Sequence, residues 1–118
     1  MKSKDPSVHA LVDLIKTILE DHKAQNTLEL DVMGLSDIAD VMIVTSGTSS
    51  RHVKSIADGL AEKVKQAGFK ILGVEGSKEA EWILVDLADV IVHVMLPNTR
   101  NFYDLERLWS ARPRDLHA

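Results

Sequence analysis

Cysteine, long apolar runs and an excess of positive charge are all missing from this sequence, and each absence excludes a class of function. Without cysteine, the chain has no disulfide, no thiolate nucleophile and no thiolate-bound zinc or iron–sulfur site. No stretch is long and apolar enough to span a membrane, and the N-terminal residues lack the apolar core of a secretory signal. These absences predict an unprocessed cytoplasmic protein.

The charge balance argues against direct binding of nucleic acid. The chain has 14 Lys and Arg against 18 Asp and Glu, for a formal net charge of −4. A domain that holds nucleic acid through its phosphates is usually basic. We therefore expect little direct nucleic-acid binding, and a protein partner, in particular a basic one, fits this charge better.

Length and apolar content indicate one globular domain. The 118 residues, 45% of them hydrophobic, suit a single core. We expect one domain over residues 1–118, with an ordered part at about 5–110 and a polar C-terminal tail.

The apolar pattern predicts an α/β fold with a mixed sheet of about five strands and about three helices. Apolar residues at helical spacing follow Pro6, Ser50 and Pro97. Strands are predicted at residues 27–32, 40–45, 70–73, 82–85 and 90–95. The helical segment between the second and third of these strands has the length of a crossover, which predicts that the two strands pair in parallel.

The stretch at residues 81–96 predicts an antiparallel hairpin with two unlike faces. If it pivots at Leu87-Ala88, Trp82 lies opposite His93 and Leu84 lies opposite Ile91. One face is then aliphatic, as expected of a face packed on helices. The other, which we call the mixed face, carries Trp82, Leu84, Asp86, Ile91, His93 and Met95. Its composition is typical of a surface that meets a partner, although another part of the chain covering it is the alternative.

The loop Ser46-Gly47-Thr48-Ser49 stands between a predicted strand and a predicted helix. Free N–H groups at a helix start attract anions, so a nucleotide-binding or nucleotidyltransferase-like enzyme is the alternative function. The glycine spacing of a phosphate-binding loop is absent, and a helix cap is the simpler interpretation. Asp86 and Asp89 are three residues apart across a turn and make no convincing metal pair. No catalytic residue, metal ligand or cofactor is predicted.

The segment at residues 98–109 concentrates arginine and aromatic residues, the types enriched in interface hot spots. Within it, Arg100 and Tyr103 are the better candidates for partner contact. Leu105 and one of the aromatic residues, with Phe102 and Trp109 as the candidates, are expected to lie in the core.

Four segments together resemble the Iojap family of bacterial ribosomal silencing factors. They are residues 40–44 with 46–49, residues 51–53, residues 75–76 with 81–86, and residues 89–95 with 102–109. Their order and spacing, rather than any one of them, carry the resemblance. The sequence departs from the family pattern at Leu87-Ala88, where many relatives have Tyr-Gly, at Glu81 in place of Gly, and at Met42 in place of an aromatic residue.

The resemblance implies a nucleotidyltransferase-like fold without the catalytic carboxylates, and no enzymatic activity. It implies binding to the large ribosomal subunit through its protein number fourteen. The bound protein would sterically block joining of the small subunit and lower translation when nutrients run short. It also implies homodimerisation through an overlapping face. By this likeness, the partner-binding residues are Trp82, Leu84, Asp86, Leu87, His93, Arg100, Phe102 and Tyr103.

Overall fold

The computed structural model describes residues 6–34, 39–105 and 107. The predicted turn at 34–37 lies largely outside this part of the chain, as do Leu108, Trp109 and the predicted tail. Within it, the element order is α1 (Pro6–Asp21), β1 (Gln25–Asp31), β2 (Val41–Ser46), α2 (Ser50–Gln66), β3 (Gly73–Glu75), β4 (Trp82–Asp86), β5 (Val90–Met95) and α3 (Pro97–Tyr103). The predicted fold class, a mixed sheet of five strands with three helices, is confirmed.

The sheet order β1-β2-β5-β4-β3 corrects one predicted pairing. The parallel neighbour of β2 is β5, while β3 lies at the far edge and pairs antiparallel with β4. The third strand also begins at Gly73 rather than at Lys70. The reason is burial: every residue of β5 is buried, so β5 takes a central place, whereas β3 is short and largely exposed.

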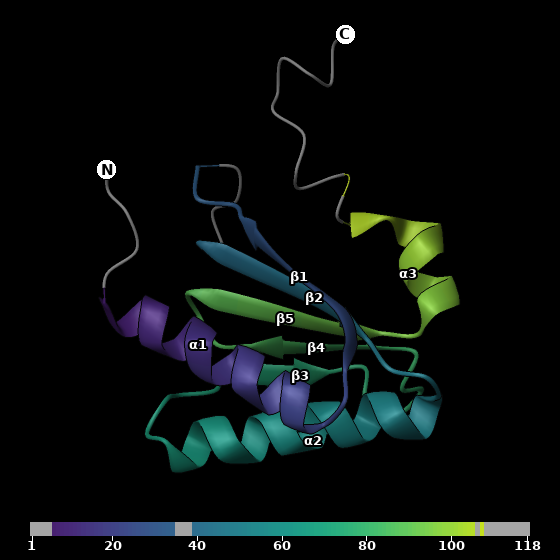
Figure 1. The fold of residues 1–118 in the computed structure, drawn as a ribbon, viewed down its shortest axis with the longest axis horizontal. Helices are drawn as coiled ribbons and strands as arrows, with labels where there is room; N and C mark the ends of the chain where they lie inside the picture. Colours follow the sequence, from purple (N-terminus) through teal and green to yellow (C-terminus); the bar gives the residue numbers. More distant parts are fainter. Residues whose placement is uncertain (1–5, 35–38, 106, 108–118) are drawn as a thin grey trace, which may run out of the picture.

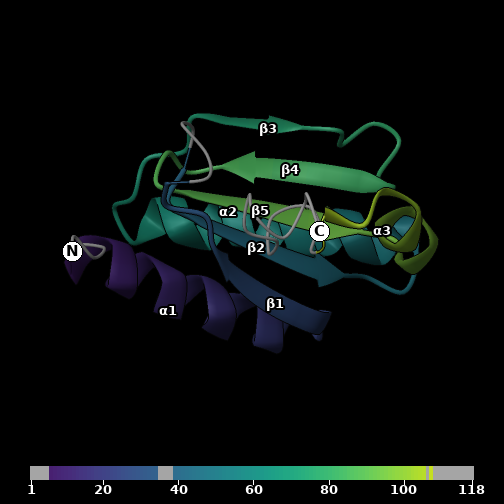
Figure 2. The ribbon, with the colours of Figure 1, turned by 90° about the horizontal axis from the view of Figure 1, so that it is seen from above.

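Helices α1 and α2 lie on the same side of the sheet, whereas α3 lies near the end of β5 on the other side (Figures 1 and 2). The core between the two helices and the sheet contains the predicted aliphatic face of the hairpin. Its five members are fully buried: Ile83, Val85, Val90, Val92 and Val94. This confirms which face of the last two strands packs on helices.

The hairpin register differs from the prediction by two residues. Trp82 pairs with Met95 and Leu84 pairs with His93, because the turn closes one residue later than expected. The Leu87 N–H donates to the Val90 carbonyl at 2.9 Å, which leaves residues 88 and 89 as the loop. A shift of two in the pairing returns each side chain to the same face, so the membership of both faces is as predicted.

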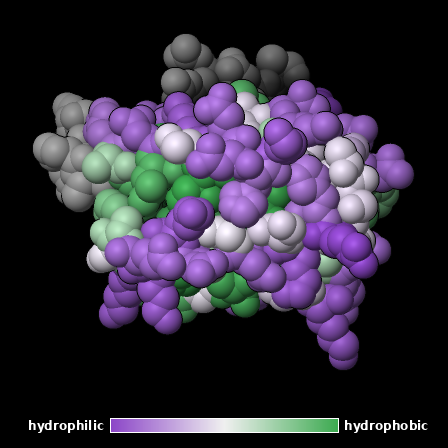
Figure 3. All heavy atoms as spheres, turned by 60° about the horizontal axis from the view of Figure 1, so that its bottom comes forward, coloured by the Kyte–Doolittle hydropathy of each residue, from purple (hydrophilic) through white to green (hydrophobic). Residues whose placement is uncertain are grey.

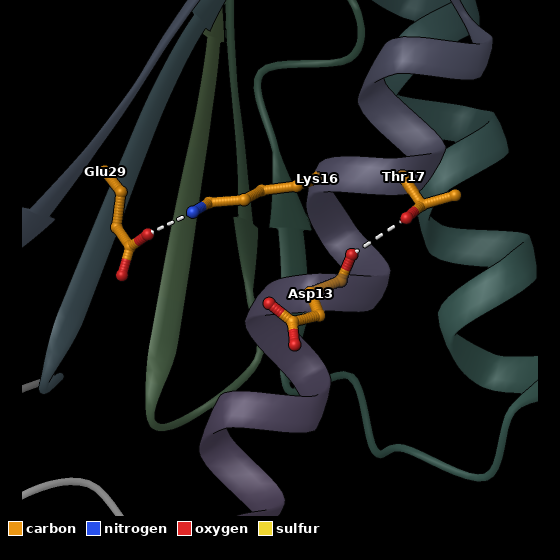
Figure 4. A network of polar contacts seen from close by, with 4 residues as sticks. All are labelled: Asp13, Lys16, Thr17 and Glu29. Carbon is orange, nitrogen blue, oxygen red and sulfur yellow. Dashed lines mark hydrogen bonds and ion pairs between the residues drawn. The ribbon is translucent and has the colours of Figure 1, made fainter.

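An ion pair fixes α1 against the outer strand β1. Lys16 Nζ lies 2.5 Å from Glu29 Oε1, as Figure 4 shows. The hydrogen bond to Glu29 raises the pKa of Lys16 above its ordinary value. On the same helix, the Thr17 hydroxyl donates to the Asp13 carbonyl at 3.1 Å. Both side chains of the ion pair are partly exposed, so the pair orients α1 more than it stabilises the domain.

Gly76 allows the loop between β3 and β4 to pass close to the backbone of β4. Its φ is +92°, and a Cβ there would overlap the carbonyl oxygen of Trp82. Gly76→Ala is therefore expected to lower the free energy of unfolding by about 2–3 kcal/mol in urea titrations. Gly73→Ala is the matched control, since a Cβ at Gly73 meets nothing within 4 Å. Equal stability of the two variants would contradict this role of Gly76.

Candidate functional site

The mixed face is the side of the sheet opposite α1 and α2. The strand pairing arranges its side chains in three rows across the strands. The first row contains Trp82, Met95 and Ser46; the second contains Leu84, His93, Val44 and Leu28; the third contains Asp86, Ile91, Met42 and Leu30. All six residues predicted for this face are therefore on it.

The sequence pattern allowed two alternatives for this face, a surface open to a partner or cover by another part of the chain, and the structure shows each in part. His93, Met95 and Ile91 are buried, and a second core forms around the β1 and β2 end of the rows. Leu105, which follows α3, packs against this core, as Trp82 also does. Trp82, Leu84 and Asp86 stay half-buried, so the surface open to a partner lies over β4.

Trp82 and His93 are joined by a hydrogen bond. The Trp82 indole Nε1–H donates to His93 Nδ1 at 2.8 Å, and the ring centroids are 5.8 Å apart. Because Nδ1 accepts, the proton of the neutral imidazole is on Nε2. Nε2 is buried and has no hydrogen-bond partner in the described part of the chain. Burial lowers the pKa of His93 to about 4, so the ring is neutral at pH 7.

Helix α3 adds two exposed aromatic side chains beside Trp82. Phe102 is 80% exposed and Tyr103 is 53% exposed. The Trp82 and Tyr103 ring centroids are 4.8 Å apart, and Phe102 meets Tyr103 edge-on at 5.0 Å. We call Trp82, Phe102 and Tyr103 the aromatic cluster. A large apolar side chain as exposed as Phe102 commonly marks a binding surface when it adjoins others.

Two predicted contact residues are buried. Leu87 is 4% exposed and belongs to the core under the helices, because the later turn makes it the residue opposite Val90. Arg100 is 9% exposed, and its Nη1 donates to the Ser46 hydroxyl at 2.9 Å. We therefore leave both out of the surface open to a partner. The other predicted residues are brought together: Trp82, Leu84, Asp86, His93, Phe102 and Tyr103.

Leu28 is an exposed member of the mixed face that the hairpin pattern alone did not reveal. It is 40% exposed on β1 and pairs with Val44 in the row of His93. The alternation at residues 27–32 was the available signal. It could not be used without knowing that β1 lies next to β2 on this side of β5.

The Ser46–Ser49 loop is occupied by internal hydrogen bonds. Ser49 caps α2 by accepting from the His52 N–H at 3.1 Å, and the Thr48 N–H donates to His52 Nδ1 at 2.9 Å. The Gly47 N–H donates to the Met95 carbonyl at 3.1 Å. The predicted cap is confirmed. An anion that used the Gly47, Thr48 or His52 N–H groups would have to displace bonds already made, so the geometry does not favour the nucleotide-binding alternative.

The Asp86 carboxylate has a structural role in the hairpin. The Asp86 side chain accepts from the Ala88 N–H at 3.0 Å and so stabilises the hairpin turn. Across residues 6–34, 39–105 and 107, His, Asp and Glu side chains nowhere gather in a group of three able to hold a metal ion. No helix in the same residues is long and apolar enough to cross a membrane.

The side of the molecule formed by α1 and α2 has a different character. It is predominantly hydrophilic, with an apolar strip recessed between polar side chains (Figure 3). Exposed large apolar side chains away from the mixed face include Leu72 and Val74, next to and on the edge strand β3. They provide matched controls for the aromatic cluster.

Comparison with known proteins indicates a family. Residues 5–117 match the model of the family described as "Ribosomal silencing factor during starvation". The "Ribosomal silencing factor RsfS" of Chromobacterium violaceum is 47% identical over 94 residues, which is 80% of this chain and 77% of that protein. The protein of the same name from Haemophilus influenzae is 45% identical over 101 residues, or 86% of this chain and 99% of that protein.

A solved structure agrees with the fold. The crystal structure of a Chromobacterium violaceum protein superimposes with a TM-score of 0.85 at 43% sequence identity. The alignment covers 88% of this chain and 87% of that one.

Proposed function

This chain belongs to the ribosomal silencing factor family, and we propose that it docks on the large ribosomal subunit through the open part of the mixed face. The observation that carries this proposal is the aromatic cluster: Phe102 is 80% exposed and stands against Tyr103, which in turn contacts Trp82. Aromatic residues at the centre of a patch supply most of the energy in many interfaces. The family resemblance names protein number fourteen of the large subunit as the partner.

The charge of the face fits a basic partner. Asp86 is half-buried on β4, and Glu75 lies next to Leu84 on the neighbouring strand β3. His93 is neutral at pH 7 because burial lowers its pKa to about 4. Acidic side chains to one side of the aromatic cluster favour encounter with a positively charged surface.

The mechanism is steric and needs no catalytic group. A folded domain held on the subunit-joining surface occupies volume that the small subunit requires. Repression in the cytoplasm under nutrient limitation follows from a shift in the balance between free and joined subunits. If a homodimer forms through the same face, dimer and ribosome complex compete, because one patch is not buried twice.

The test is a subunit-joining assay on sucrose gradients. Adding the protein to isolated large subunits before small subunits is expected to shift the profile from joined to separate subunits, with the protein migrating with the large subunit. A profile that stays joined at saturating protein would refute the proposal. Protein migrating with the small subunit would refute it equally.

A further inference from the structure

We infer that Arg100 is a positioning residue: anchored on Ser46, it holds α3 in the orientation that presents Phe102 and Tyr103 to the partner. The inference rests on the proposed function for its binding consequence. Arg100 would then act through the aromatic cluster and not by touching the partner itself.

The anchor joins two distant parts of the chain beneath the surface. Arg100 Nη1 lies 2.9 Å from Ser46 Oγ, across 54 residues of sequence. Ser46 is the last residue of β2 and is 2% exposed, on the row of the mixed face that contains Trp82. Placing a guanidinium at such a position is unfavourable unless its N–H groups are hydrogen-bonded. The contact therefore fixes the side chain and, with it, the helix.

Helix α3 depends on such a contact because it is weak on its own. It has seven residues, its N-cap Leu96 makes no side-chain cap bond, and it ends at Asp104 in a left-handed conformation with φ of 50°. Isolated helices of this length are not stable in water. Phe102, at 80% exposure, contributes little packing that would hold the helix down.

Orientation of α3 matters for affinity. A partner that meets a preformed aromatic cluster does not have to order it, and the entropy cost of binding falls accordingly. The Trp82 and Tyr103 rings, 4.8 Å apart, are in place only if α3 keeps its position over β5. Loss of the anchor should therefore weaken binding although no partner contact is removed.

Ser46→Ala is the decisive variant, because a side chain that is 2% exposed does not reach a partner. It is expected to weaken large-subunit binding by roughly 3- to 10-fold, which corresponds to the net contribution of about one ordinary hydrogen bond. Arg100→Met should weaken binding at least as much. The double variant should show less than the sum of the two effects, since both remove the same contact. Ser55→Ala, on the exposed surface of α2, is the matched control.

A readout without ribosomes separates this inference from the proposed function. In Ser46→Ala, amide hydrogen exchange should accelerate in α3, including the Arg100 and Asp104 N–H groups that bond to Leu96 and Arg100, while β2 and α2 stay protected. If the unaltered protein does not bind large subunits, the proposed function fails and exchange alone still tests the anchor. Unchanged exchange in Ser46→Ala overturns the anchor. Faster exchange in Ser46→Ala with unchanged large-subunit binding overturns the positioning role of Arg100. The same conclusion follows if the losses of binding in the two single variants add up in the double variant.

Discussion

Alanine at both Trp82 and Phe102 is expected to weaken binding to large ribosomal subunits by at least about 100-fold, the effect of removing two aromatic hot spots. The Phe102 side chain is largely exposed to solvent, and the Trp82 ring packs against the ring of Tyr103. The affinity should be measured by co-sedimentation over a range of subunit concentrations. Phe102→Ala alone should weaken binding by at least about 10-fold.

Controls separate binding from folding. Phe102→Ala should change the free energy of unfolding by less than about 0.5 kcal/mol, because the side chain is exposed. Trp82→Ala also removes the hydrogen bond to His93 and will cost some stability, so the single Phe102 variant is the cleaner probe. Leu72→Ala removes an equally apolar side chain, 56% exposed, from another part of the surface and should leave affinity unchanged. Equal losses in Phe102→Ala and Leu72→Ala would contradict the proposed face.

Acid is expected to destabilise the domain through His93 by up to about 3 kcal/mol, the free-energy equivalent of its pKa shift. Burial lowers the pKa of His93 from 6.5 to about 4. As the pH falls below 6.5, the unfolded chain takes up a proton at this site while the folded chain does not. The stability contribution is therefore fully present above pH 6.5, declines as the pH falls, and is lost below about pH 4.

His93→Asn separates this contribution from those of the other titratable groups in the chain. Asparagine does not titrate, and its side-chain oxygen can accept the Trp82 N–H in place of Nδ1. Urea unfolding of both proteins between pH 7 and pH 4 should show the stability of the unaltered protein falling more steeply than that of the variant. If the free energy of unfolding fell in parallel for the two proteins, His93 would take up its proton as readily in the folded state as in the unfolded state.

Local alternation carried the prediction of the hairpin faces. Trp82, Leu84 and His93 share a face whether the turn pivots at residue 87 or one residue later, because the pairing then shifts by two. The apolar spacing of α2 likewise predicted its buried residues: Val53, Ile56, Ala57, Leu60 and Val64. Both patterns depend on neighbours close in sequence.

Contacts between segments far apart in the sequence could not be predicted from such local patterns. Nothing in the sequence around Arg100 indicates that it hydrogen-bonds to Ser46, 54 residues away, and its charge suggested exposure instead. The same holds for the pairing of β2 with β5, which depends on the burial of β5 along its whole length and not on the length of the crossover. Leu87 was named as a contact residue by the family resemblance alone, whereas the turn places it opposite Val90 in the core under the helices.

Site-specific photo-cross-linking tests the docking surface most directly. Benzoylphenylalanine introduced in place of Phe102 should, on irradiation with large subunits, form a covalent product with ribosomal protein number fourteen. The same group in place of Leu72, which is also exposed but lies away from the aromatic cluster, should not. A product with that protein from position 72 and none from position 102 would contradict the account.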